Sequence, residues 1–259
     1  METRPVVIVT GAARRIGRAI ALELAAHGWD VAVHHRDSAD DAQATAAELR
    51  ALGARAQVFA ADLADETACR ALLPAVAAAL GGVQAVVNNA SVFAYDSVAD
   101  FSYAAMERHW RANTAPAIVL AHALHAHLAS AGDRGCVVNL LDHKLWNPNP
   151  DYLSYTLSKA ALHSATTLLA QALAPAVRVC GVAPGLILGS ADLPAADVER
   201  LQRQAPLQRA TSPQDIARAV RYLLESPAIT GYSLLVDGGQ HLQPMARDFI
   251  FHPSTTSDR

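Results

Sequence analysis

Cysteine is scarce in this sequence, which has three cysteines among 259 residues. Cys69, Cys136 and Cys180 lie far apart along the chain and lack the close spacing of metal-binding pairs. We therefore expect no metal site. The three thiols are expected to be small buried side chains of a protein in a reducing compartment, the cytoplasm.

A strong excess of charge of one sign and an unbroken long apolar run are also missing. The formal net charge is -3, so there is no basic field that would attract nucleic acid. An uncharged stretch, residues 71–95, is interrupted by Pro74 and by the pair Gly81-Gly82. It predicts a helix followed by a buried strand, not a membrane span. We expect neither nucleic acid nor a membrane as a partner.

The sequence does contain a regular alternation of two kinds of segment. Short apolar runs, typical of strands covered on both faces, alternate with longer stretches rich in alanine and leucine, typical of helices. The predicted strands are Val6–Thr10, Val31–His34, Ala56–Ala60, Ala85–Asn88, Cys136–Leu140, Arg178–Val182 and Leu234–Val236. The predicted helices are Ile16–His27, Asp40–Leu52, Glu66–Leu80, Thr114–Ser130, Tyr155–Leu173 and Pro213–Leu224.

This alternation predicts an α/β fold: a Rossmann-type doubly wound sheet of about seven mostly parallel strands, with helices on both faces. No linker or repeat divides the chain. We expect a single domain over residues 1–244 and a partly packed or flexible C-terminal extension over residues 245–259. Sheets of this kind bind ligands beyond the carboxyl ends of their strands.

The segment TGAARRIG follows the first predicted strand and opens a helix. Gly11 and Gly17 bracket this turn, so a pyrophosphate can approach the backbone amides at the helix N-terminus. The middle glycine of the usual pattern is missing, and Arg15 stands there. A plain strand-to-helix turn is the alternative interpretation, but the position in the first turn favours a dinucleotide.

The second predicted strand ends in HHRDS, where an enzyme that uses NAD often carries an acidic residue. His35, Arg36 and Ser38 occupy this place, and Arg15 can face the same point. Arginine suits a phosphate because its fork binds two oxygens. The sequence therefore predicts NADPH in preference to NADH, with a solvated arginine cluster as the alternative.

Polar residues follow the third and fourth predicted strands. Asp62 can accept from the adenine amino group or merely cap the next helix. Asn88, Asn89 and Ala90 lie beside the expected nucleotide, where the small alanine leaves room for a flat ring. Asn113 lies in a helical region and, because a buried amide needs partners, is expected to hold a water or a main-chain carbonyl near the lysine described next.

The segment NLLDHKLWNPNPDYLSYTLSKAAL contains a tyrosine and a lysine one helical turn apart, which is typical of a proton-transfer pair. These are Tyr155 and Lys159. A carboxylate, Asp142, precedes them, and the alternative role for it is a helix cap. Tyr152 has a second spacing to Lys159, which enoyl-thioester reductases use. We favour Tyr152 as a packing residue at the helix start.

These motifs together, with Pro184-Gly185 and the late VDGG, resemble the short-chain dehydrogenase/reductase family over about Val6 to Leu242. A narrower resemblance, to pteridine and dihydromonapterin reductases, depends on TGAARRIG, HHRDS, NNASVF, Asp142 and the ending DGGQHL. This resemblance implies roles for individual residues.

Catalysis is assigned to Asp142, Tyr155, Lys159 and Asn113. The cofactor-binding residues are expected to be Gly11, Arg14, Arg15, Ile16, Gly17, His35, Arg36, Ser38, Asp62, Leu63, Asn89, Ala90, Tyr155, Lys159, Pro184, Gly185 and Ile187. The substrate-binding residues are expected to be Arg15, Ser91, Phe93, Asp142, Tyr155, Gly185, Leu186 and Leu188.

The resemblance implies an NADPH-dependent reductase that converts 7,8-dihydropterins, such as dihydromonapterin, dihydrobiopterin or dihydrofolate, to tetrahydropterins. Hydride would be transferred to C6, and N5 would gain a proton. Asp142 fits this chemistry better than ketone reduction, because a carboxylate repels a developing oxyanion. Two alternatives stay open: an NADP-dependent ketone, 3-ketoacyl or enoyl thioester reductase, and a non-catalytic dinucleotide-binding regulator.

The predicted helix Tyr155–Leu173 is almost free of charge after Lys159, which favours burial on several sides. The resemblance implies that such helices pair across subunits in a homotetramer, with a dimer also possible. In the extension, Met245, Phe249 and Phe251 are apolar enough to pack. We expect residues 247–252 to cross to a neighbouring subunit.

Overall fold

The structure, a computed structural model, describes residues 4–189 and 193–251. Within these ranges seven strands form one sheet in the order β3-β2-β1-β4-β5-β6-β7, and every neighbouring pair is parallel. The strands are β1 (Val6–Val9), β2 (Asp30–His35), β3 (Ala56–Ala60), β4 (Ala85–Asn88), β5 (Gly135–Leu140), β6 (Val177–Pro184) and β7 (Ser233–Val236). The predicted doubly wound sheet is confirmed, and it is parallel throughout rather than mostly parallel.

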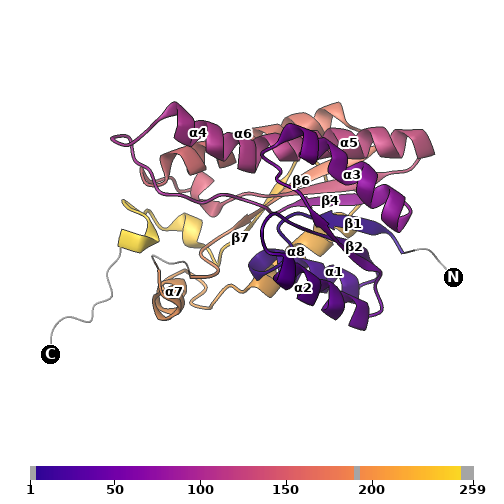
Figure 1. Cartoon of the computed structure of the whole chain (residues 1–259). Helices are drawn as coiled ribbons and strands as arrows, with labels where there is room; N and C mark the ends of the chain where they lie inside the picture. The colour runs from indigo at the N-terminus through magenta and orange to yellow at the C-terminus, as the bar shows by residue number, and fades with distance from the viewer. Residues whose placement is uncertain (1–3, 190–192, 252–259) are drawn as a thin grey trace.

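Helices cover both faces of the sheet (Figure 1). On one face lie α1 (Arg15–Ala26), α2 (Ala39–Ala51) and α8 (Pro213–Glu225). On the other lie α3 (Glu66–Leu80), α5 (Ala115–Ala131) and α6 (Leu153–Ala172). The shorter helices are α4 (Tyr103–His109), the π-helical turn η1 (Trp110–Thr114), η2 (His143–Leu145), α7 (Ala195–Gln202), η3 (Gln240–Leu242) and η4 (Phe249–Phe251).

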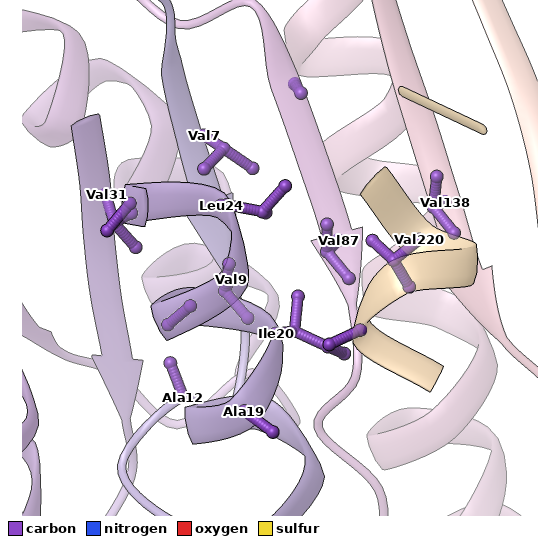
Figure 2. Packing of buried hydrophobic residues seen from close by; sticks show 14 of the residues in the cluster. Val7, Val9, Ala12, Ala19, Ile20, Leu24, Val31, Val87, Val138 and Val220 are labelled. Carbon is purple, nitrogen blue, oxygen red and sulfur yellow. The ribbon is translucent and has the colours of Figure 1, made fainter. Parts of the chain in front are cut away.

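The hydrophobic core has one cluster on each face of the sheet, which explains why the strand sequences are continuously apolar. Val7 and Val9 of β1 belong to the cluster under α1 and α8, whereas Val6 and Ile8 belong to the cluster under α3 and α5. Strand side chains alternate between faces, so a strand covered on both faces must be apolar at every position. Figure 2 shows Ile20 of α1 among the valines of the first cluster. Truncating such a fully buried side chain to alanine costs about 2–5 kcal/mol.

Element boundaries differ from the predicted ones where local hydrogen bonding, not hydrophobicity, decides them. The predicted helix Thr114–Ser130 begins instead at Ala115, because residues 110–114 form a π-helical turn. Thr10 lies outside β1: its hydroxyl oxygen accepts from the backbone N–H groups of Asn89 and Ala90, both at 2.9 Å. Helices α4 and α7 were not predicted, since seven and eight residues give too little helical periodicity.

Topology brings the candidate residues together at one edge. The chain builds the sheet outward from β1 to β3, then returns to place β4 on the other side of β1. The strand order therefore reverses between β1 and β4, and a crevice forms beyond their carboxyl ends. Within the described ranges, no helix combines the length and apolar character needed to cross a membrane.

Candidate active site

Two cavities adjoin at the carboxyl edge of the sheet, and Arg15, Ile16, Asn89 and Ser91 line both of them. We call the one beside the first strand-to-helix turn the glycine-turn cavity; its volume is about 390 Å³. We call the other the Asp142 cavity; its volume is about 330 Å³.

The glycine turn is tight enough to require glycine at its second position. Gly11 has φ +63, and a Cβ added to Gly17 would lie 2.2 Å from the Gly11 carbonyl oxygen. Asn89 closes the turn from β4: its side-chain amide donates to the carbonyl oxygens of Thr10 at 2.9 Å and Gly11 at 3.2 Å. The chain is thus left with a smooth, small-residue surface at the N-terminus of α1, as a bound pyrophosphate requires.

His34 supports this turn and was not predicted as a functional residue. Its Nδ1 accepts from the Gly11 backbone N–H at 3.1 Å, and its Nε2 lies 3.1 Å from the Ala61 carbonyl oxygen. These partners are those of a neutral ring that donates from Nε2. Burial lowers the pKa of His34 to about 4, so the ring stays neutral near pH 7. The two consecutive histidines in HHRDS were the only sequence signal for this role. The sequence does not reveal which of the two rings packs against the glycine turn.

The cations of the glycine-turn cavity are exposed and weakly held. Arg14 lies 3.7 Å from Asp41, and Arg36 pairs with its neighbour Asp37 at 2.5 Å. Exposed ion pairs contribute about 0–1 kcal/mol, so both guanidinium groups can turn to a phosphate at little cost. Arg15 donates to the Gly189 carbonyl oxygen at 2.9 Å from a backbone with φ +57.

Asp62 does not cap the next helix, which was one of its two predicted roles, and its contact with an adenine amino group stays a prediction. Its carboxylate accepts from the Ala64 backbone N–H at 3.0 Å and so forms a turn after β3. The cap of α3 is Asp65, which accepts from the N–H groups of Thr67 and Ala68. Asp62 still lines the glycine-turn cavity, where its exposed carboxylate can meet an amino group.

The Asp142 cavity contains a carboxylate bonded directly to a tyrosine. The Tyr155 hydroxyl donates to Asp142 Oδ2 at 2.8 Å. The same carboxylate accepts from the Lys144 backbone N–H at 2.9 Å and caps η2. The capping role of Asp142 is therefore confirmed, and its part in catalysis stays a prediction. Lys159 Nζ donates to the Leu140 carbonyl oxygen at 2.7 Å and lies 5.8 Å from the centre of the Tyr155 ring.

Burial and the charge of Asp142 keep Tyr155 protonated, and burial makes Lys159 easier to deprotonate. Burial, followed by the charge and hydrogen bond of Asp142, raises the pKa of Tyr155 well above its usual value. Burial lowers the pKa of Lys159 to about 8, and the charge of Asp142 opposes that shift. Near pH 7 the chain thus presents a neutral tyrosine hydroxyl beside an acceptor carboxylate and a lysine poised to exchange its proton.

Asn113, predicted as catalytic, uses its hydrogen bonds within the protein. Its Oδ1 accepts from the Val92 N–H at 2.7 Å and the Ser91 hydroxyl at 3.1 Å. Its Nδ2 donates to the Val92 carbonyl oxygen and to the Ser158 hydroxyl, each at 3.0 Å. The expected main-chain carbonyl is that of Val92, and Asn113 lines neither cavity. It fastens the segment that carries Phe93 onto α6, and its part in catalysis stays a prediction.

Two aromatic rings support Phe93 at the wall of the Asp142 cavity. Phe93 stacks on Tyr152, with ring centres 4.1 Å apart, and meets Tyr155 edge-on at 4.7 Å. Phe93 is half exposed, whereas Tyr152 is 2% exposed. Tyr152 is therefore a packing residue, as favoured from the sequence, and Tyr155 is the tyrosine that lines the cavity.

The C-terminal extension packs on its own chain in this structure, and Figure 1 shows it at the same end of the molecule as α7. Arg247 makes three hydrogen bonds of 2.9–3.1 Å to the buried Asp151 carboxylate. Met245 and Phe249 line the Asp142 cavity, and Phe251 meets Tyr95 edge-on. The extension therefore packs on its own chain, as expected for Met245, Phe249 and Phe251. The crossing to a neighbouring subunit stays a prediction. Residues 252–259 lie outside the described ranges.

The structure gathers nearly all predicted site residues around the two cavities. Every predicted substrate-binding residue lines the Asp142 cavity. The predicted cofactor residues divide between the cavities, with Tyr155, Lys159, Pro184, Gly185 and Ile187 on the Asp142 side. Sequence reasoning missed several lining residues, among them His34, Asp37, Ala61, His143, Lys144, Asn147, Asn149, Met245, Asp248, Phe249 and Ile250.

The donor set around the two cavities fits a phosphorylated dinucleotide. Small residues and a helix N-terminus form one end, exposed arginines flank it, and Lys159 lines the adjoining Asp142 cavity. In the part of the chain that the structure describes, histidine, cysteine and acidic side chains nowhere gather as a group of three or more that could hold a metal ion.

Comparison with known proteins gives a family model and full-length relatives. A model described as enoyl-(acyl carrier protein) reductase matches residues 11–241. Pteridine reductase 1 from Leishmania tarentolae is 33% identical over 93% of this chain and 97% of its own length. L-rhamnose 1-dehydrogenase (NAD(P)(+)) from a Sphingomonas strain is 32% identical over 91% of this chain and 96% of its own length.

A solved structure resembles the chain in fold and sequence together. FolM alternative dihydrofolate reductase 1 from Brucella suis, in complex with NADP, is 41% identical and covers 94% of this chain and 97% of its own, with a TM-score of 0.89. The relatives thus share one fold, and the substrates that their names state differ.

Proposed function

Because the chain belongs to the short-chain dehydrogenase/reductase family, we propose that this oxidoreductase uses NADPH to reduce 7,8-dihydropterins to tetrahydropterins. The substrates would be dihydromonapterin, dihydrobiopterin or dihydrofolate. One observation carries the proposal: the Tyr155 hydroxyl donates a hydrogen bond to the Asp142 carboxylate, with an O–O distance of 2.8 Å, inside the Asp142 cavity.

The carboxylate disfavours reduction of a ketone at this position. Hydride addition to C=O builds negative charge on oxygen. At an effective dielectric constant of about 20, two unit charges 4 Å apart repel by about 4 kcal/mol. Reduction of C=N instead requires the nitrogen to gain a proton. The product carries N–H groups that can donate hydrogen bonds to a carboxylate.

The proposed reaction adds one hydride and one proton across the C6=N5 double bond of the substrate. When bound, NADPH supplies the hydride, which adds to C6 of the 7,8-dihydropterin, while N5 gains a proton from solvent or a relay. Asp142 accepts from the substrate and holds the Tyr155 hydroxyl in place. For a fully oxidised pterin, Asp142 and Tyr155 would assist protonation at N8. The raised pKa of Tyr155 suits it to act as a neutral donor.

The remaining residues hold the two ligands in place. Gly11, Gly17 and the α1 N-terminus would bind the pyrophosphate, and Arg36 with Arg15 would bind the 2′-phosphate. Lys159 retains donors for the nicotinamide ribose beside its bond to Leu140. The half-exposed Phe93 would stack on the pterin ring. The NADP complex of the Brucella suis relative and the activity in the name of the Leishmania relative support these assignments.

Oxidation of NADPH, followed by absorbance, tests the proposal. The purified protein is supplied with dihydromonapterin, dihydrobiopterin or dihydrofolate and, separately, with acetoacetyl and crotonyl thioesters. We expect turnover of at least one dihydropterin, with kcat/KM exceeding that for either thioester. The absence of turnover on every pterin would remove the proposal.

A thioester reductase is the second candidate, because the matching family model carries the description of an enoyl reductase. In such an enzyme Tyr152 or Tyr155 would face the thioester carbonyl. Tyr152 is buried under Phe93, and the Tyr155 hydroxyl is engaged by Asp142, so both observations favour the pterin. Turnover of the thioesters alone would reverse this ranking.

We also propose that the protein forms a homotetramer, or failing that a dimer, through the outer side of α6. Leu157 and Leu168 on this helix are 44% and 64% exposed in the single chain. Leucines on one uncharged helix gain free energy by pairing with a second copy. Light scattering of wild type and of Leu168→Glu would test the assembly; a monomeric wild-type protein would contradict it.

A further inference from the structure

The C-terminal segment 245–251 forms a wall of the Asp142 cavity and is anchored at one buried carboxylate. Asp151 is 2% exposed and lies one residue before Tyr152 at the start of α6. Besides its three bonds from Arg247, it accepts from the Asp248 backbone N–H at 2.7 Å. The Arg247 guanidinium also lies 3.9 Å from the Phe251 ring centre. These contacts fix the backbone at Asp248.

This anchoring places the Asp248 carboxylate at the cavity that Asp142 also lines. Its side chain is 14% exposed, and its nearest cation is Lys144, with Asp248 Oδ2 and Lys144 Nζ 3.4 Å apart. Lys144 is itself 5% exposed, and its Nζ also donates to the Asp151 carbonyl oxygen. Two carboxylates from segments far apart in the sequence therefore share one cavity.

Asp248 has acceptor capacity that the protein does not use. An ionised carboxylate offers about four acceptor sites. The hydrogen bonds to the Asp248 carboxylate are long: 3.4 Å from Lys144 and 3.5 Å from the Ile250 backbone N–H. Burial raises its pKa, and Asp142 adds to the shift while Lys144 opposes it. A partly desolvated carboxylate of this kind gains from a ligand that brings two N–H donors.

Asp142 is less available for the same task. Its Oδ2 already accepts from the Tyr155 hydroxyl, and its Oδ1 accepts from the Lys144 backbone N–H. A substrate with donors on two edges would therefore find one acceptor beside the reacting tyrosine and a second at the C-terminal wall. A carboxylate matches an N–H and an adjacent NH₂ group with two parallel hydrogen bonds.

We propose that Asp248 is a specificity-determining residue that binds the N3–H and 2-amino edge of the pteridine ring. This inference rests on the proposed function and names the part of the substrate that the C-terminal segment recognises. Asp248 does not take part in the chemical step, so its loss should raise KM more than it lowers kcat.

A matched pair of substrates isolates this contact. 6-Methyl-7,8-dihydropterin carries the 2-amino group, and 6-methyl-7,8-dihydrolumazine carries an oxo group in its place. Each is titrated calorimetrically into the NADP⁺-loaded protein, and each is assayed with NADPH. Wild type should bind the dihydropterin at least roughly tenfold more tightly than the dihydrolumazine, since a hydrogen bond to a charged group is lost.

Asp248→Asn should abolish this preference by weakening dihydropterin binding roughly tenfold or more, with dihydrolumazine binding within about twofold. Asp248→Glu, which keeps the carboxylate, should retain a preference of the same sign. Asp133→Asn is the control, because Asp133 is exposed in the turn after α5, at the opposite edge of the sheet. Thermal melting of each variant establishes that it is folded.

The outcomes separate the two proposals. A wild-type preference that survives in folded Asp248→Asn overturns the role of Asp248 while pterin reduction stands. Equal wild-type affinity for the two compounds, with turnover of both, also overturns the role of Asp248. A wild-type protein that neither binds nor reduces the dihydropterin overturns both proposals.

Discussion

The two adjoining cavities are built in different ways. The glycine-turn cavity depends on backbone: a turn that only glycine can complete, a helix N-terminus, and exposed arginines in weak surface pairs. The Asp142 cavity depends on buried and half-buried side chains from segments separated along the whole chain, with Asp142, Tyr155 and Lys159 in contact. We expect the first cavity to bind the cofactor, and we propose that the second selects the substrate.

This difference predicts different responses to substitution. In the glycine-turn cavity, a substitution that changes the shape of the turn should weaken cofactor binding strongly, because backbone groups would bind the pyrophosphate. A substitution that removes a charge should weaken it only mildly, because the charged side chains are solvated. In the Asp142 cavity, removal of one charged group should lower activity strongly. Its partner groups are desolvated, and their protonation states depend on that charge. Each of the following experiments tests one side of this contrast.

The largest effect is expected from Asp142→Asn. The amide keeps the size of the side chain but no longer accepts as a carboxylate, so kcat for a dihydropterin should fall roughly 10²–10³-fold. KM for NADPH should change less than about twofold, because the glycine-turn cavity is untouched. Steady-state kinetics with both substrates varied would measure this. Unchanged pterin kinetics, with Asp133→Asn as reference, would refute the assigned role.

Gly17→Ala should produce the next largest effect, on the other cavity. The added Cβ would lie 2.2 Å from the Gly11 carbonyl oxygen, so the turn must open. Overpacking of this kind costs about 1–3 kcal/mol, which corresponds to roughly 5- to 150-fold weaker NADPH binding. Fluorescence titration with NADPH measures it.

Gly28→Ala is the matched control for that substitution. Gly28 has φ +90, and nothing lies within 4 Å of an added Cβ. Its replacement should lower stability through backbone strain, by about 1–2 kcal/mol, and leave NADPH affinity unchanged. Equal losses of NADPH affinity in the two variants would show that the close approach at Gly17 is not what matters.

A smaller effect is expected when charge alone is removed from the glycine-turn cavity. Arg36→Ala should reduce the preference for NADPH over NADH about tenfold, because one charge-assisted contact to the phosphate is lost. KM for NADH should stay the same. The exposed Arg70, which pairs with Glu66 on α3, provides the control variant Arg70→Ala. If Arg36→Ala left the cofactor preference unchanged, another cation would have to carry it.

The subtlest prediction concerns pH. The pKa of Lys159 is lowered to about 8, so its charged form is present below that pH and is lost as pH rises through it. We expect kcat/KM for the dihydropterin to fall above about pH 8. The charge of Asp142 raises the Lys159 pKa, so the residual activity of Asp142→Asn should fall at lower pH than wild type. A profile whose alkaline limb does not move would contradict this coupling.

The sequence was sufficient to predict the parts that depend on local pattern. Strands covered on both faces must be apolar throughout, and this made β1, β4 and β5 visible without any structure. Helices α4 and α7 were missed because they are short. The glycine turn was visible because its residues are consecutive and only small side chains fit there.

The wall of the Asp142 cavity could not be predicted, because its contacts join distant positions. Lys144 and Asp248 are 104 positions apart, and Arg247 and Asp151 are 96 apart. A single lysine or aspartate in a sequence does not indicate which distant residue it will pair with in the folded protein. His34 is a different case: it lies beside a predicted residue, and only its burial against Gly11 and Ala61 reveals its task.

Asn113 limits how this enzyme could be redesigned. All four of its hydrogen-bonding capacities are occupied: two acceptor sites by Val92 and Ser91, and two donors by Val92 and Ser158. Aspartate has the same shape but cannot donate, and leucine can neither donate nor accept. An engineer can therefore vary position 93 to admit a different ring, whereas position 113 must remain an amide of this length and position 91 must keep a donor.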